Sequence, residues 1–93
     1  MITHIVFFKF RDARDIERVK EALLGLQGKV PQLRHLEVGV DIIRSERSYD
    51  LALVTKFDSL EDLDAYQVHP DHQEVAKLIG TVKESAVAVD YQS

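Results

Sequence analysis

The sequence predicts an α+β fold of the ferredoxin-like class, in which helices cover one face of a four-stranded antiparallel sheet. Three observations lead to this prediction. Apolar residues recur with a period of two in some segments and of three to four in others. The segments follow the order β-α-β-β-α-β, which is the ferredoxin-like order. The length of 93 residues suits one domain, which we expect over residues 1–93.

The first strand is predicted over residues 2–10, ITHIVFFKF, because β-branched and aromatic residues dominate it. Residues 13–27 are predicted to form a helix, since apolar residues recur there at steps of three and four. Asp12 or Asp15 suits the N-terminus of this helix, where a carboxylate accepts hydrogen bonds from the free backbone N–H groups. Gly28 suits its end. The charged side of this helix is interpreted as a solvated surface rather than a docking face.

Two more strands are predicted over residues 35–43, HLEVGVDII, and 49–57, YDLALVTKF, where apolar and other residues alternate. Ser59 then begins a helix in a variant of the capping box. Pro70 suits a first helical turn, so a separate short helix is expected from there. Gly80 is expected to end it.

The last strand is predicted over residues 84–91, ESAVAVDY, and it completes a sheet with two apolar faces. When helices cover only one face of an antiparallel sheet, the other face is usually polar. We therefore expect the uncovered face to pack against the sheet of a second copy, forming a homodimer. The residues predicted for that face are Ile5, Phe7, Ala52, Val54, Ala86 and Ala88.

The composition excludes several classes of function. The chain has no cysteine, which rules out disulfides, thiolate catalysis and thiolate metal sites. The net charge is −4 and the basic residues are not clustered, so no nucleic-acid partner is expected. No apolar run could span a membrane and no signal peptide is visible, so we expect no membrane association and a cytoplasmic location. Glycine-rich phosphate loops and Gly-x-Ser-x-Gly signatures are absent.

The stretch AYQVHPDHQEV, residues 65–75, carries the side chains most suited to chemistry. Near neutral pH an imidazole such as His72 can act as a general base. The Tyr66 hydroxyl can donate to a substrate oxygen that gains charge. His4 shares its strand face with Val6 and so is expected to face the helices. Structural roles fit equally: His4 could bond a backbone carbonyl at the edge of the core, and Tyr66 and His72 could brace the helix bend.

A metal site is a weaker interpretation of the same stretch. His69 and His72 are one helical turn apart, and His4 could supply a third ligand. However, Pro70 breaks regular helix geometry between the pair, and no zinc-type motif accompanies them. We therefore predict no metal and no cofactor, and a structural role for His69.

Three stretches carry a family resemblance: THIVFFKF at 3–10, YDLALVTKFDSLEDLDAYQVHPDH at 49–72 and AVAVDY at 86–91. They resemble the stress-responsive A/B barrel (Dabb) family. This resemblance implies a dimeric α+β barrel in which two sheets pack face to face. The family includes a plant cyclase that forms olivetolic acid by intramolecular aldol condensation. By analogy it implies functional roles for His4, Tyr66 and His72, whereas a histidine of that enzyme is replaced here by Leu51.

Two functions fit these observations. The first is cofactor-free acid–base chemistry, of a cyclase or lyase kind, on a small aromatic or β-keto compound. His72 would be the base, and His4 and Tyr66 would hold the oxygen that gains charge. The alternative is a stress-associated binding or structural dimer without turnover. The ligand-binding walls of the pocket, which Tyr66 would also line, are predicted to be Val6, Phe8, Leu53, Val75, Leu78 and Val87.

Overall fold

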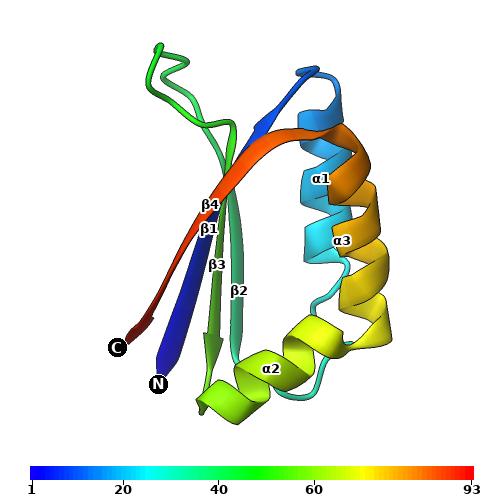
Figure 1. Ribbon diagram of the computed structural model, residues 1–93, viewed down its shortest axis with the longest axis vertical. Helices are drawn as coiled ribbons and strands as arrows, with labels where there is room; N and C mark the ends of the chain where they lie inside the picture. The colour runs from blue at the N-terminus through cyan, green and yellow to red at the C-terminus, as the bar shows by residue number, and fades with distance from the viewer.

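Seven elements follow one another in the computed structural model, which describes residues 1–93 (Figure 1). They are β1 Ile2–Phe10, α1 Asp15–Leu24, β2 His35–Val40, β3 Leu51–Phe57, α2 Leu60–Val68, α3 Pro70–Val82 and β4 Lys83–Gln92. The order is the predicted one, with the second helix divided into α2 and α3. The predicted α+β ferredoxin-like class is confirmed.

The four strands form one antiparallel sheet in the order β2-β3-β1-β4. All three helices lie on one side of this sheet, and its other side is open (Figure 1). The N- and C-termini lie side by side, because β1 and β4 are neighbours and the Ser93 N–H donates to the Met1 carbonyl. β1 is one of the two inner strands, and it has one face toward the helices and the other toward the open side.

The register of β4 corrects the predicted faces of two alanines and one valine. Ala86 and Ala88 lie opposite Phe8 and Val6, which face the helices. Val87 lies opposite Phe7 on the open side. Residues directly opposite each other in an antiparallel pair share a face, so the predicted placement of all three in β4 was wrong.

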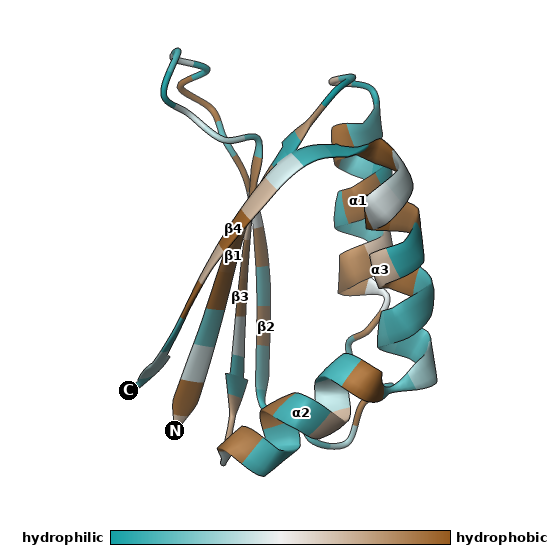
Figure 2. Cartoon of the chain, in the orientation of Figure 1, coloured by the Kyte–Doolittle hydropathy of each residue, from teal (hydrophilic) through white to brown (hydrophobic).

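The open face is even more apolar than predicted. Figure 2 shows hydrophobic colour in the middle of β1 and of β4, where the two strands are neighbours. Phe7, Val87, Val89 and Tyr91 keep between 44% and 62% of their surface exposed. Together with the correctly predicted β1 and β3 residues, these side chains define what we call the sheet face: Ile5, Phe7, Ala52, Val54, Val87, Val89 and Tyr91.

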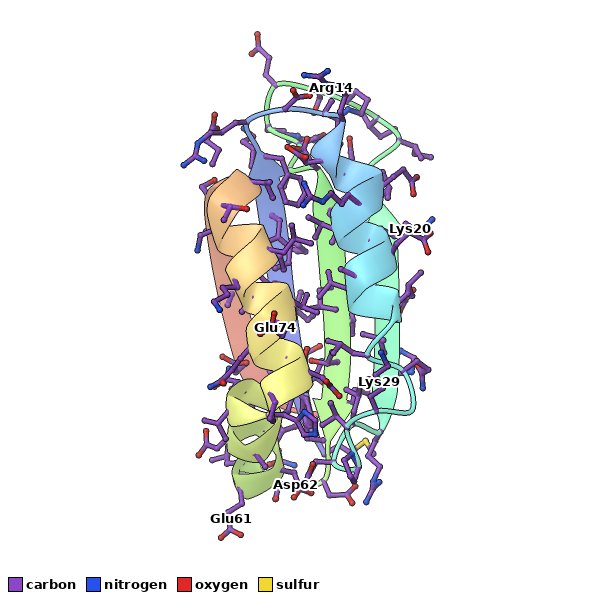
Figure 3. All side chains as sticks on the ribbon, turned by 90° about the vertical axis from the view of Figure 1, so that its right-hand side faces the viewer. Arg14, Lys20, Lys29, Glu61, Asp62 and Glu74 are labelled. Atoms are coloured by element: carbon purple, nitrogen blue, oxygen red, sulfur yellow. The ribbon has the colours of Figure 1, made fainter.

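The hydrophobic core lies between the helices and the opposite face of the sheet. The stripe of α1 packs there through Ile16, Val19 and Leu23, which are nearly or fully buried. Side chains from the helices fill the space above the strands, while Lys20 and Glu74 lie on the outer side of the helical layer (Figure 3). Burying each large apolar side chain contributes about 1.5–3 kcal/mol, so this layer holds α1 and α3 in place.

The ends of α2 and α3 follow from local hydrogen bonds. The Ser59 hydroxyl accepts the backbone N–H of Asp62, as the capping pattern predicted. His69 caps α3, since its Nδ1 accepts the backbone N–H of Asp71 at 3.1 Å. This is a structural role, as expected for His69. The helix runs through Gly80 to Val82, so its predicted end was wrong. An interior glycine costs only about 1 kcal/mol, which the buried Ile79 offsets.

The loop between β2 and β3 begins earlier than predicted, because β2 ends at Val40. Ile42 and Ile43 are consequently 88% and 74% exposed. The base of the loop is fixed by Asp50, whose buried carboxylate accepts the Phe10 N–H and an Arg44 guanidinium N–H, both at 2.8 Å. Although burial raises it, the pKa of Asp50 is lowered overall by these donors.

Candidate functional site

A cavity of about 200 Å³ lies between α3 and the covered face of the sheet. Six of its ten lining residues are apolar, and the polar ones include two imidazoles and one amine. Its walls are His4, Val6, Phe8, Leu23, Leu53, Gln67, His72, Ala76, Ile79 and Lys83. The structure thus brings His4 and His72 to one cavity, together with the predicted walls Val6, Phe8 and Leu53.

Two larger hollows, of about 410 and 300 Å³, lie elsewhere on the molecule. Both are lined by residues of the sheet face, and Phe7 lines each of them. Neither contains an imidazole. Because His4 and His72 both line the smaller cavity, we take that cavity, rather than either of the two larger hollows, as the candidate site.

His4 is buried in β1 and bonded through Nδ1 to the carboxylate of Asp90 in β4. The two residues lie directly opposite each other in the sheet register. An ionised carboxylate only accepts, so Nδ1–H of His4 donates to it and Nε2 is the free ring nitrogen. The backbone carbonyl that one of the two interpretations of His4 assumed is replaced by the Asp90 carboxylate, which the sequence interpretation missed.

His72 lies in the first turn of α3, with Nδ1 3.1 Å from the Gln67 carbonyl oxygen. Since a carbonyl only accepts, Nδ1–H donates and Nε2 keeps its lone pair. Burial lowers the pKa of His72, and electrostatic repulsion from the imidazoles of His4 and His69 lowers it further, against the opposing effect of the Gln67 bond. The ring is therefore neutral at pH 7, which is the form a general base needs.

Tyr66 lies beside His72 but does not line the cavity. Its ring is fully buried, with its centroid 5.0 Å from that of Phe57 and 4.4 Å from that of His72. The hydroxyl is buried without a hydrogen-bond partner in the chain. Burial raises its pKa to about 12. The prediction that Tyr66 lines the pocket was wrong: its ring packs against that of His72 at a tilt of 53°, without a hydrogen bond between them.

The cavity side of α3 differs from the predicted one. His72, Ala76 and Ile79 follow at steps of four and three, which is one face of α3, and Lys83, the first residue of β4, comes four residues later. Val75 and Leu78 do not line the cavity, because they lie beside this stripe; their predicted place was wrong. Val87 was also predicted to line the pocket, but it lies on the open side of β4.

Several lining residues were not recognised from the sequence. Counting helical steps from His72 would have found Ala76 and Lys83, although neither is a large apolar residue of the kind expected to line a pocket. Ala76 is small, and this leaves room between α3 and β1. Gln67 and Leu23 come from other helices, so only the packing of α1 and α2 brings them to the cavity.

Neither a membrane span nor a ready-made metal centre is found in the structure. None of the helices is both long and apolar enough to cross a bilayer. No three or more His, Asp or Glu side chains are grouped so as to hold a metal ion. Instead, the His69 imidazole is engaged at the start of α3, where its Nδ1 caps the helix.

Comparison with protein families gives one match over almost the whole chain. The model described as Stress Responsive A/B Barrel Domain matches residues 2–93. The stress-response A/B barrel domain-containing protein DABB1 of Arabidopsis thaliana is 31% identical over 98% of this chain. The chain spans only 46% of the length of that relative. An uncharacterized protein of Streptomyces coelicolor is 37% identical, over 78% of this chain and 80% of its own length.

Solved structures with the same fold include several described as dimers. A dimeric ferredoxin-like protein of unknown function from Bacteroides fragilis is 34% identical and superposes with a TM-score of 0.89, over 99% of this chain and 95% of its own. A dimeric ferredoxin-like protein from Thermobifida fusca is 32% identical, with a TM-score of 0.88 over 99% and 90% of the two chains. The hydroxynitrile lyase of Passiflora edulis shares the fold at 22% identity, with a TM-score of 0.83 over 97% and 90%.

Proposed function

Because this chain belongs to the stress-responsive A/B barrel (Dabb) domain family, we propose that it is a homodimer that binds a small aromatic or β-keto compound and transfers protons on it without a cofactor. One observation supports this above all others. Two imidazoles, His4 and His72, line the same mostly apolar cavity, and in each ring the chain itself occupies Nδ1. A few convergent polar groups in an apolar cavity are the usual form of a small-molecule site.

His72 is the base in this proposal. Its lowered pKa keeps the ring neutral at pH 7, and the Gln67 carbonyl holds the tautomer that leaves the lone pair on Nε2. Nε2 takes a proton from a carbon next to a carbonyl group of the bound compound. Tyr66 is a positioning residue here, since its ring packs against His72 without lining the cavity.

His4 stabilises the oxygen that gains negative charge when that proton leaves. In its protonated form the ring offers Nε2–H to the oxygen, while Asp90 accepts Nδ1–H and neutralises the charge of the ring. Donors aimed at developing charge in a water-poor site are among the largest contributions to catalysis. The resulting enolate can then attack a second carbonyl, as in a cyclase, or expel a leaving group, as in a lyase.

The homodimer is proposed to form through the sheet face. Its side chains are apolar and half exposed in the single chain, and structural relatives are described as dimeric. Exposed apolar patches of this kind mark interfaces. Two such faces in contact would give the α+β barrel that the sequence resemblance implies.

A two-dimensional NMR titration with alkyl-resorcylic acids and related small aromatics tests the proposed ligand site. Saturable shifts are expected at His4, Gln67 and His72, and they should weaken in His72→Ala. His35→Ala is the matched control, because His35 is an exposed imidazole of β2 outside the cavity. Shifts confined to the sheet face, or equal affinity in wild type and His72→Ala, would remove the assignment.

A non-catalytic binding dimer is the second candidate, and one observation favours it. Of the three polar groups that the family resemblance implied, Tyr66 lies outside the cavity lining. A site with two rather than three of these groups can still bind a ligand. Saturable binding at both histidines without any proton exchange on the ligand would support this candidate over the enzyme.

A further inference from the structure

Lys83, an exposed residue, gives the cavity a fourth polar group beside His4, His72 and Gln67. It follows the last residue of α3 and lies opposite Phe10 in the β1–β4 register. Phe10 is six residues beyond His4, which corresponds to about 20 Å along a strand at roughly 3.3 Å per residue. On the helix side, His72 and Lys83 are eleven residues apart, or about 16 Å at 1.5 Å per residue.

The wall between these two ends is apolar. Val6 and Phe8 of β1 and Ala76 and Ile79 of α3 are among the residues that line it. A flexible lysine side chain spans part of the separation itself, so the space left for a ligand is shorter than the backbone distance. The volume of about 200 Å³ exceeds the roughly 150 Å³ that holds a benzene molecule, which leaves room for one ring and a short chain.

The amine of Lys83 has no partner within the chain. It takes part in none of the ion pairs, which engage other groups such as Arg34 with Asp58, and it donates no side-chain hydrogen bond. Its neighbour Glu84 forms no ion pair with it. In a chain of net charge −4, an unpaired cation at a cavity is a local site of attraction for anions.

We infer that the ligand is a slender amphipathic carboxylate: Lys83 binds its anionic end, and its aromatic or carbonyl end lies between His4 and His72. This inference rests on the proposed function and adds the charge and shape of the ligand. The pairing of an ammonium group with a carboxylate is a charge-assisted hydrogen bond, stronger than a neutral one. Lys83 is thus a specificity-determining residue rather than a catalytic one.

The test compares para-hydroxyphenylalkanoates of increasing chain length with their neutral primary amides, using NMR titration of the whole chain. Carboxylates should bind better than amides only once the chain is long enough to reach Lys83. We expect a preference of about 1.5- to fivefold, in line with an exposed ion pair. Lys83→Met should abolish this preference and leave amide binding unchanged, whereas Lys83→Arg should retain it.

Lys77→Met is the control, because Lys77 is an exposed lysine of α3 that does not line the cavity. It should keep the full preference. If wild type binds acids and amides equally with shifts at both histidines, the inference about Lys83 fails while the proposed function stands. If neither series shifts the histidines, both fail. Retention of the native NMR spectrum in each variant excludes unfolding as the cause of a loss.

Discussion

The Nδ1–H of His4 donates to the carboxylate of Asp90, and these two residues lie directly opposite each other in the register of β1 and β4. They are 86 positions apart in the chain. The contact therefore depends on the assembled sheet and not on any local motif. It fixes the orientation of an imidazole that lines the cavity and, in the neutral form of the ring, its tautomer.

Asp90→Asn should disturb that tautomer without unfolding the protein. The amide has no charge to hold the ring and can offer an N–H group instead of an oxygen, so both tautomers of His4 become populated. Imidazole nitrogen chemical shifts measured at neutral pH would detect this change. Asp64→Asn, an exposed carboxylate of α2, is the control. A spectrum of His4 identical in Asp90→Asn and wild type would show that the carboxylate does not set the tautomer.

The lowered pKa of His72 predicts an acid-sensitive fold. In the unfolded chain this histidine takes up a proton near pH 6.5, whereas in the folded protein it does so only at lower pH. Between these two pKa values the unfolded state therefore binds more protons than the folded state, so a falling pH favours unfolding. The contribution of His72 to the free energy of unfolding should be constant above pH 6.5 and should fall as the pH drops from 6.5 through the pKa of the folded state.

His72→Gln should flatten this part of the stability profile, as measured by urea unfolding at a series of pH values. His4→Gln should raise the titration midpoint of His72 in NMR, because electrostatic repulsion from His4 contributes to lowering the pKa of His72. A His72 midpoint at or above 6.5 in the wild type would contradict both expectations.

Tyr66→Phe should leave the protein as stable or make it more stable. The hydroxyl is buried without a partner, and an unsatisfied buried group costs about 1–3 kcal/mol. Because the pKa of Tyr66 is raised to about 12, only the unfolded tyrosine ionises between pH 10 and about 12. The stability contributed by Tyr66 is therefore present below pH 10 and is lost between pH 10 and about 12. Thermal unfolding at neutral and alkaline pH would detect both changes.

Tyr66→Ala is the contrasting variant and should cost about 3–5 kcal/mol, since it empties a core position beside Phe57 and His72. Ligand affinity in Tyr66→Phe should stay close to that of the wild type, because the hydroxyl does not line the cavity. A tenfold loss of affinity in Tyr66→Phe would instead assign the hydroxyl to the ligand.

Val87→Glu should convert the proposed dimer to a monomer. Burying an unpaired carboxylate between two sheets costs several kcal/mol, which a modest apolar interface cannot offset. Light scattering at micromolar concentration measures the result directly. Leu60→Glu is the control, since Leu60 is 63% exposed on α2, away from the sheet face. A monomeric wild type, or a Val87→Glu variant that stays dimeric, would rule out this interface.

The order of elements was predictable from the sequence because each element carries its own local signal. Ser59 marks a helix start because its hydroxyl can accept a backbone N–H of the first turn. Pro70 marks one because it has no N–H group to leave unpaired there. The faces of β4 were not predictable, because residues 86–89 alternate between alanine and valine, so both faces look apolar. Only pairing with β1 decides which of the two sets meets the helices.

The histidines of the site could be identified from sequence, but their partners could not. Asp90 contacts His4 only through the strand register, and Lys83 lies beyond the glycine that was expected to end the helix. That expectation weighed local propensity alone. Packing of Ile79 against the core keeps α3 helical through Gly80, and so carries the cavity as far as Lys83.

The most direct test of the central claim is the exchange of α-protons on a β-keto aromatic acid in deuterated water, followed by NMR. Wild-type protein should accelerate exchange well above the buffer rate, with a rate that follows the deprotonation of His72, and His72→Gln should abolish the acceleration. Exchange at the buffer rate despite saturable binding at His4 and His72 would contradict the proposed acid–base chemistry and leave a binding protein.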